Sequence, residues 1–463
     1  MNRFYPLLVV LAAALIAGCS TQPKYERPAV ELPQAWKQSA PRFAQDGRWW
    51  RIYEDQELEK IVAEALEGNY DLIVAAARVD EARGLAAEAR SFLLPRIDAQ
   101  GSASRDQIST RTANSFPGLP REFSTYTATL NLSYEVDLFG RLRSNVEAAR
   151  AELAASEAAR EAVRVALAAE VAKSYFSLRS FEQQVLLTRQ TLDLREEALG
   201  LQRKRRDAGV IGDYELRQLE AEAAAARAQL PGLEQARERE EVALQLLLGR
   251  DAKQVFETQI PRRECPDTKL LAPVLPAGMP SELLLRRPDL VQAERSLAAA
   301  NARVAVARAE MFPSISLTGA LGSQSAALSN LFAGGAGIWT LAAAVSQPIF
   351  SGGRTEARTE AARARERAAL AQYQQAVRVA FGEVRNALVA QTRAREAFEA
   401  QSARADALAE TLRLARLRYS SGIASQLEVM DAERGLLDAR AARIDALRAH
   451  RAAIADLFRA LGG

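Results

Sequence analysis

Residues 126–138 read Tyr-Thr-Ala-Thr-Leu-Asn-Leu-Ser-Tyr-Glu-Val-Asp-Leu, and apolar and polar side chains alternate over all thirteen positions. This period of two is typical of a β-strand with one apolar and one polar face. A strand that crosses a bilayer needs only about 9–11 residues, so this stretch is long enough. We expect the apolar face to meet lipid and the polar face to meet water. The polar face carries Thr127, Thr129, Asn131 and Ser133.

A partner strand precedes this stretch. Ile97, Ala99, Gly101 and Ala103 alternate with polar residues, and a loop that contains Pro117-Gly118 follows them. The pattern predicts a β-hairpin with strands at about 95–107 and 124–139. A second hairpin, at about 313–323 and 337–350, repeats the pattern less cleanly, because alanines interrupt the polar face of its second strand.

The hairpin belongs to a longer internal duplication. Pro95 matches Pro313 at a shift of 218 residues, and Gly209 matches Gly422 at a shift of 213. The five-residue difference arises between Pro95 and Arg141. Because an insertion is tolerated best in an exposed loop, we expect a loop there. A duplication of this length indicates two copies of one structural unit rather than a single active site.

Each hairpin is followed by a very long helical stretch. Residues 141–206 contain no proline and a single glycine, and residues 355–421 share this composition. About 66 residues at 1.5 Å each would form a helix of ~100 Å. Both stretches end at a glycine, Gly209 or Gly422, which permits the left-handed conformation that caps a helix. A return helix is expected after each turn.

These patterns predict a mostly α fold with a β-barrel contribution, built from a duplicated unit of helix, β-hairpin, long helix and return helix. The expected organisation is a signal peptide at 1–18, an extended tether at 19–54, a first repeat at 55–249, a linker at 250–285 and a second repeat at 286–463. The long helices are expected at about 141–207 and 355–421, and the return helices at about 213–248 and 425–461.

Composition excludes several classes of function. The chain has 61 basic and 58 acidic residues, so it lacks the basic excess of a dedicated nucleic-acid binder. It has one histidine, His450. A histidine-based metal site or a Ser-His-Asp triad therefore lacks parts, and we expect neither an enzyme nor a cofactor. We expect His450 to be an ordinary surface residue of a polar helix.

The N-terminus has the features of an export signal. A basic residue and a short apolar run precede Ile16-Ala17-Gly18-Cys19, which resembles a bacterial lipobox in which the cysteine is acylated. The alternative is a plain secretory signal with an accidental cysteine. In that family of signals, a residue such as Ser20 after the cysteine usually directs export to the outer membrane. If Cys19 carries acyl chains, Cys265 has no partner for an intrachain disulfide.

Four membrane strands cannot close a barrel by themselves, because the smallest such barrels have about eight. An open sheet edge in lipid leaves backbone groups unpaired, at several kcal/mol each. The chain is therefore expected to oligomerise, so that its sheets join edge to edge.

The chain resembles the TolC-like outer-membrane efflux channels, and within them the lipoprotein branch. The resemblance covers nearly the whole mature chain and rests on the lipobox, the duplicated unit and three short motifs. The motifs are Tyr134-Glu-Val-Asp-Leu-Phe-Gly140, Arg418-Tyr419-Ser-Ser-Gly422 and Leu427-Glu428-Val-Met-Asp431-Ala432. The resemblance implies a homotrimer with a twelve-stranded barrel in the outer membrane and a helical tunnel across the periplasm. It also implies a periplasmic adaptor and an inner-membrane pump as partners.

The resemblance places a periplasmic gate near the helical turns. The family's aperture carboxylate falls on Asp431, with Glu428 on the same helix face and Tyr419 beside them. Asp213 and Glu215 occupy the equivalent turn of the first repeat. The alternative is that Asp431 pairs with Arg434 on a solvated face. The family often has a basic residue at the position of Ala424, so the network that would hold the aperture shut is an open question.

The same resemblance implies that the tips Gly209, Val210, Gly422 and Ile423 dock the adaptor, although glycine is also needed for the turns themselves. The alternative to a channel is a lipid-anchored periplasmic coiled-coil scaffold, against which the alternation at 126–138 argues. No motif selects a cargo.

Overall fold

The structure, a computed structural model, describes residues 25–28, 47–109, 120–261 and 286–463. The chain divides into two compact units. The sheet unit comprises Met1–Ala29, Arg78–Glu157 and Gln292–Gln374, and the hairpin unit comprises Val30–Ala77, Ala158–Val291 and Gln375–Gly463. Each unit therefore takes segments from both halves of the sequence. The proposed lipidation site Cys19 and the second cysteine, Cys265, lie outside the described residues.

The duplication expected from the sequence is visible in the lengths of the elements. Helices α3 and α8 have 22 residues each, strands β1 and β3 have 12 each, and helices α4 and α9 have 67 each. In chain order the elements are η1 (Trp49–Tyr53), α2 (Gln56–Gly68), α3 (Tyr70–Ser91), β1 (Arg96–Gln107), β2 (Glu122–Val136), α4 (Arg141–Asp207), α5 (Asp213–Leu247), α6 (Ala252–Glu257), α8 (Pro288–Ala309), β3 (Ser314–Ser325), η2 (Leu328–Asn330), β4 (Gly337–Ser346), α9 (Arg354–Ser420) and α10 (Gln426–Leu461).

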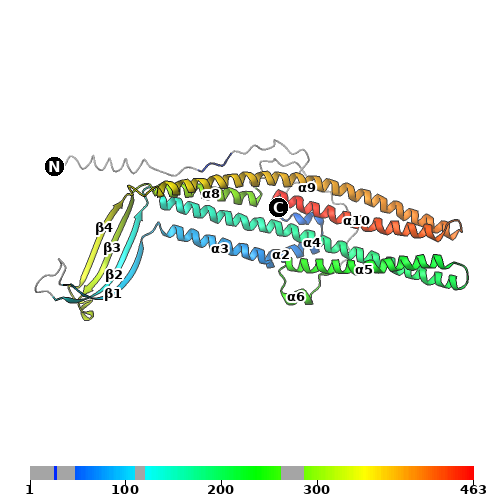
Figure 1. Ribbon diagram of the computed structural model, residues 1–463, viewed down its shortest axis with the longest axis horizontal. Coiled ribbons are helices and arrows are strands. Elements are labelled where there is room, and N and C mark those ends of the chain that lie inside the picture. Colours follow the sequence, from blue (N-terminus) through cyan, green and yellow to red (C-terminus); the bar gives the residue numbers. More distant parts are fainter. Residues whose placement is uncertain (1–24, 29–46, 110–119, 262–285) are drawn as a thin grey trace. The chain divides into compact units, whose positions relative to one another are not determined.

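The four strands form one antiparallel sheet in the order β1-β2-β3-β4, as Figure 1 shows. The central pairing, β2 with β3, joins the two repeats. Leu130 is opposite Ala99 on β1 and Leu321 on β3, and Leu321 is opposite Trp339 on β4. Because directly opposed residues share a face, one apolar face runs across all four strands. The apolar face is therefore continuous, whereas Ala342 and Ala344 interrupt the polar face on β4.

This apolar face is exposed in the single chain. Leu321 is 65% exposed, and Trp339 and Leu341 are each 77% exposed. The edge strands β1 and β4 are exposed along their whole lengths, so they offer unpaired backbone groups to another chain. None of the described helices combines the length and the apolarity that crossing a bilayer requires.

Strand β2 ends two residues before the sequence alternation does. Asp137 leaves the strand and accepts hydrogen bonds from the backbone amides of Leu142 at 3.1 Å and Arg143 at 2.8 Å. A carboxylate at this position satisfies amides that the first turn of α4 leaves free. Glu135 is held by Arg141, with N–O distances of 3.0 and 2.7 Å. Glu135 and Asp137 continue the polar alternation, and their carboxylates bind residues of the first turn of α4.

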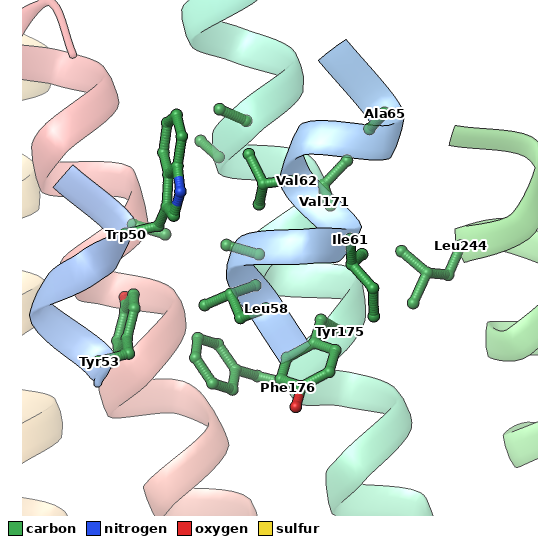
Figure 2. Packing of buried hydrophobic residues seen from close by; sticks show 14 of the residues in the cluster. Trp50, Tyr53, Leu58, Ile61, Val62, Ala65, Val171, Tyr175, Phe176 and Leu244 are labelled. Carbon is green, nitrogen blue, oxygen red and sulfur yellow. The ribbon is translucent and has the colours of Figure 1, made fainter. Parts of the chain in front are cut away.

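Helices η1 and α2 pack into the core of the hairpin unit. Figure 2 shows Tyr53 and Leu58 packed against Phe176, with Val171 and Leu244 nearby. The Tyr53 and Phe176 rings lie edge to face with centroids 4.6 Å apart. Asp55 caps α2 with one carboxylate oxygen, and its other oxygen accepts a hydrogen bond from Tyr175 at 2.7 Å. Burial raises the pKa of Tyr175.

The expectation for His450 was wrong. His450 is 2% exposed and lies in α10, in a segment that also buries Leu447 and Ile454. Its Nε2 atom has no hydrogen-bond partner among the described residues. Arg448 and Arg451 lie close to it in the sequence, but the helical period turns His450 inward. Burial first, and then Arg395 and Arg451, lower the pKa of His450 to about 4.

Candidate gate at the helical turns

The two helical turns of the hairpin unit are capped in the same way. At the first turn, the amide of Gly209 donates to Arg206 O at 2.9 Å and that of Val210 donates to Arg205 O at 2.8 Å. At the second, the amides of Gly422 and Ile423 bond the equivalent carbonyls at 3.0 and 2.9 Å. Gly209 and Gly422 have φ values of 71° and 73°, which glycine adopts without the cost that a Cβ imposes. Both turns are Schellman motifs.

Each turn presents an apolar β-branched residue to solvent. Val210 is 61% exposed and Ile423 is 72% exposed. Tyr214, one residue into α5, is 70% exposed. In many Schellman motifs the residue after the glycine packs back onto the helix, and here it is exposed instead. The tips therefore offer apolar surface that the chain itself does not cover.

Equivalent ion pairs brace the two hairpins. Arg203 on α4 lies 3.2 Å from Glu220 on α5, and Arg416 on α9 lies 2.8 Å from Glu433 on α10. The two pairs are related by the shift of 213 residues that relates the repeats. Each pair joins the two helices of its own hairpin, so it stabilises the hairpin whatever the other hairpin does.

Other contacts cross between the hairpins. The Tyr419 hydroxyl, on α9, accepts hydrogen bonds from Arg205 Nη1 at 2.9 Å and from Gln202 Nε2 at 3.4 Å, both on α4. Gln202 is buried, and its Oε1 atom has no partner among the described residues. Ala424 carries no charge, and the guanidinium that faces Tyr419 comes from Arg205 of the other hairpin.

A second link between the two hairpins joins the return helices α5 and α10. Arg434 on α10 donates to Glu222 on α5 at 2.7 Å, and it lies 3.6 Å from Asp431 on its own helix. Arg195 on α4 also pairs with Glu222, at 3.1 Å. The alternative partner for Asp431 at i+3 is therefore present in the single chain, but the shorter contact of Arg434 is with Glu222.

The remaining carboxylates predicted for the gate lie at the turns and are exposed. Glu428 is 3.5 Å from Arg418, and Asp213 is 3.4 Å from Arg206. Glu215 folds back over Gly212, where an added Cβ would lie 2.9 Å from its Oε2 atom. The structure thus places Tyr419, Glu428 and Asp431 on one hairpin and Asp213 and Glu215 on the other.

The residues that link the hairpins were missed by sequence reasoning. Arg205, Gln202 and Glu222 resemble any other polar residue of a long helix, because their partners lie on another helix more than 200 positions away or on the opposite arm. The one signal was negative, namely the missing basic residue at Ala424. A hollow of about 250 Å³ lies beside this network, lined in part by Gln202, Tyr419 and Met430.

The model of the family described as outer membrane efflux protein matches residues 61–250 and 279–463. The chain belongs to this family. It is therefore an outer-membrane efflux protein, and the recognition drawn from the lipobox, the duplication and the motifs is confirmed. The predicted fold class, a mostly helical chain with a β-sheet contribution from a duplicated unit, is confirmed as well.

Three curated relatives illustrate the family. Outer membrane protein OprJ of Pseudomonas aeruginosa is 38% identical, over 98% of this chain and 95% of the relative. Toluene efflux pump outer membrane protein TtgC of Pseudomonas putida is 34% identical, over 99% and 95%. Cation efflux system protein CusC of Escherichia coli is 34% identical, over 100% and 99%.

The fold matches that of a solved channel over nearly the whole chain. The crystal structure of the Campylobacter jejuni CmeC outer membrane channel aligns with a TM-score of 0.89 and 27% identity, over 96% of this efflux protein and 95% of that chain. The localisation expected from the sequence, the outer membrane, is confirmed at this level.

Proposed function

We propose that three copies of this efflux protein form one channel, which is the outer-membrane component of a tripartite pump. The observation that carries the proposal is the four-stranded sheet with an exposed apolar face and two unpaired edges. Three sheets joined β4 to β1 give twelve strands and leave no open edge in lipid. A barrel of this size is wider than the side-chain-filled eight-stranded case.

The polar face of the sheet suits the wall of a water-filled pore. It carries Thr127 opposite Gln324, Thr129 opposite Gly322 and Asn131 opposite Ala320 on the central strands. These side chains are small or uncharged and polar. Such a wall hydrates a solute without holding it, as passive conduction requires.

The gate lies at the helical turns of the hairpin unit in this proposal. In a trimer, Asp431, Glu428, Asp213 and Glu215 each become a ring of three carboxylates, and such rings favour cations. The contacts of Arg205 with Tyr419 and of Arg434 with Glu222 hold the two hairpins of one chain together, and so favour the closed arrangement. Opening separates the hairpins and breaks both links, whereas the braces Arg203–Glu220 and Arg416–Glu433 remain.

The exposed tips are the proposed docking sites for the periplasmic adaptor. Val210 and Ile423 offer apolar side chains on turns whose backbone is held by the hydrogen bonds of the Schellman motifs, which lowers the entropy that a partner must overcome. A photo-crosslinking amino acid at Val210 or Ile423, used in the native host, should capture the adaptor. The same probe at Leu186, an exposed apolar residue of α4 away from the turns, is the matched control and should not.

The proposed anchor is the acylated Cys19. Each buried CH₂ group contributes about 0.8 kcal/mol, so several acyl chains hold the N-terminus firmly at the membrane. Mass spectrometry of the N-terminal peptide would show the acyl groups, and an unmodified Cys19 would leave a plain secretory signal as the explanation.

The proposed cargo is a toxic small molecule or ion that the inner-membrane pump delivers. TtgC is named for toluene and CusC for cations, although each is 34% identical to this chain. Overall similarity therefore does not separate an organic cargo from a metal ion, and the pump that accompanies the channel is the better guide.

Single-channel conductance of the purified trimer in a planar bilayer tests the proposal. A channel should show rare openings of large conductance. An intact trimer that inserts and never conducts would favour the non-channel scaffold instead, and a particle other than a trimer would refute the twelve-stranded arrangement.

A further inference from the structure

A short N-terminal segment is fixed to the sheet unit. The guanidinium of Arg27 contacts the carboxylate of Glu294, on α8, with Nε–Oε1 and Nη2–Oε2 distances of 2.8 and 2.5 Å. Two parallel N–H···O bonds of this kind are strong and directional. Glu294 is only 7% exposed. Without Arg27, it would be a buried carboxylate that has lost its bidentate partner, which is costly.

Tyr25 is part of the same buried cluster. Its hydroxyl is buried and has no hydrogen-bond partner among the described residues. Burial first, and then the nearby Glu294 carboxylate, raise the pKa of Tyr25 to about 12, and the same two causes raise the pKa of Tyr373 on α9. Tyr25, Arg27, Glu294 and Tyr373 therefore form one cluster in which α8 and α9 receive the segment.

The distance from the cluster to the sheet, measured along α8, can be compared with the reach of the chain from the cluster back to Cys19. From Glu294 to Ala309, where α8 ends just before β3, the helix rises ~22 Å over 15 residues. Cys19 stands eight residues before Arg27, and eight residues span at most ~28 Å. The chain can thus reach from Glu294 to the start of the sheet with only about 6 Å to spare.

We propose that Arg27 and Glu294 form a clamp that fixes the length of the N-terminal tether, so that the lipid anchor holds the membrane surface at the junction between α8 and β3. The inference rests on the proposed acylation of Cys19. Because the clamp limits the reach of residues 19–27, the acyl chains meet the leaflet that borders the apolar sheet face. A longer free tether would leave the sheet and the anchor independent of each other.

Deletion of residues 21–24 tests the length requirement. Arg27 then stands four residues after Cys19, a reach of at most ~14 Å. This is less than the ~22 Å along α8, so the acylated variant must open its clamp. Hydrogen–deuterium exchange of the full chain in lipid nanodiscs should show at least tenfold faster exchange around Arg27 and Glu294. Insertion of four Gly-Ser residues at the same place is the matched control and should leave the exchange unchanged.

Two further variants separate the parts of the proposal. Arg27→Ala should open the clamp with or without acyl chains, and the charge swap R27E/E294R should restore protection. In a Cys19→Ser chain, the deletion should have no effect, because no anchor pulls on the tether. An acylated deletion variant with wild-type protection overturns the length requirement, and wild-type protection in Arg27→Ala overturns the clamp. Absence of acyl groups by mass spectrometry shows that the anchor itself has failed.

Discussion

The guanidinium of Arg205, on α4, donates a hydrogen bond to the Tyr419 hydroxyl, on α9, over 2.9 Å. The two residues are 214 positions apart and belong to different repeats. By the shift of 213, the repeat partner of Arg205 is Arg418, which instead contacts Glu428 within its own hairpin. The Arg205–Tyr419 link therefore has no equivalent formed by Arg418, and it lies at a point where the two repeats differ.

Removal of this link should open the channel. We expect Arg205→Gln or Tyr419→Phe to weaken the closed arrangement by about 1 kcal/mol per chain. The loss of one link corresponds to about a fivefold rise in resting open probability, and the loss of three links that act together corresponds to about 150-fold. Single-channel recording at fixed salt measures it. Because both changes remove the same bond, the double variant should be no more open than Tyr419→Phe, which also removes the contact with Gln202.

Arg203→Gln is the matched control for this link. Arg203 lies two residues before Arg205 on α4, but its partner, Glu220 on α5, belongs to the same hairpin. Resting conductance should stay at the wild-type level. Equal opening in Arg203→Gln and Arg205→Gln would show that any loss of charge near the turn loosens the helices, and that no specific link holds the gate.

Asp431→Ala should also raise resting conductance. Loss of the Asp431 carboxylate removes its attraction for Arg434, and an exposed pair is worth about 0.2–1 kcal/mol per chain. The expected rise is therefore severalfold. Asp438→Ala, on the same helix two turns away and also exposed, should leave conductance unchanged. If Asp431→Ala behaves like this control, Asp431 is a surface residue paired with Arg434.

The sequence predicted features whose cause is local. The alternation at 126–138 determines which residues of β2 share a face, and Gly209 and Gly422 mark turns that need positive φ. The i+3 spacing also identified Arg434 as a partner of Asp431. In contrast, the contact between Arg205 and Tyr419 depends on how two helices pack, and no spacing along the chain encodes that distance.

The central pairing of the sheet depends on Gly322. An added Cβ there would lie 2.1 Å from Ala128 O and 2.7 Å from Thr129 Cα, whereas at Gly319 the nearest atom is 3.8 Å away. Backbone atoms in a hydrogen-bonded ladder cannot move aside cheaply. We expect Gly322→Ala to cost about 1–3 kcal/mol per chain or more and to lower the yield of trimer in the outer membrane.

Gly319→Ala tests whether this effect comes from contact or from the loss of a strand glycine. Both positions are on β3, and alanine should be tolerated at Gly319. Heat-resistant trimer on a semi-native gel gives the readout. Comparable trimer yields for the two variants would mean that β2 and β3 are further apart than the structure shows.

The residues that sequence reasoning misplaced share a physical cause. Asp137 continues the polar alternation of β2, yet it caps α4, because the alternation does not show where a strand stops. His450 stands between Arg448 and Arg451 in the sequence, yet the packing of α10 buries it. In both cases the sequence pattern predicts the secondary structure of the stretch correctly, but a contact with another element determines where the individual residue lies.

Burial of His450 makes the hairpin unit sensitive to acid. The pKa of His450 falls from its ordinary value of 6.5 to about 4 in the folded chain, because burial, Arg395 and Arg451 disfavour the charged imidazole more than Glu399 favours it. Between these values the unfolded chain binds a proton that the folded chain does not. Stability from this group is therefore complete above pH ~6.5 and is lost as the pH falls toward 4.

His450→Gln should remove this part of the pH dependence. Across that window, the wild-type protein should lose at most about 1.4 kcal/mol per pH unit per chain more than the variant. Urea unfolding at pH 7, 6, 5 and 4.5 measures both curves, and paired carboxylates contribute equally to each. Glutamine at a buried site lowers stability at every pH, so the test is the slope rather than the value at pH 7. Parallel curves would mean that His450 takes up its proton in the folded chain as easily as in the unfolded one.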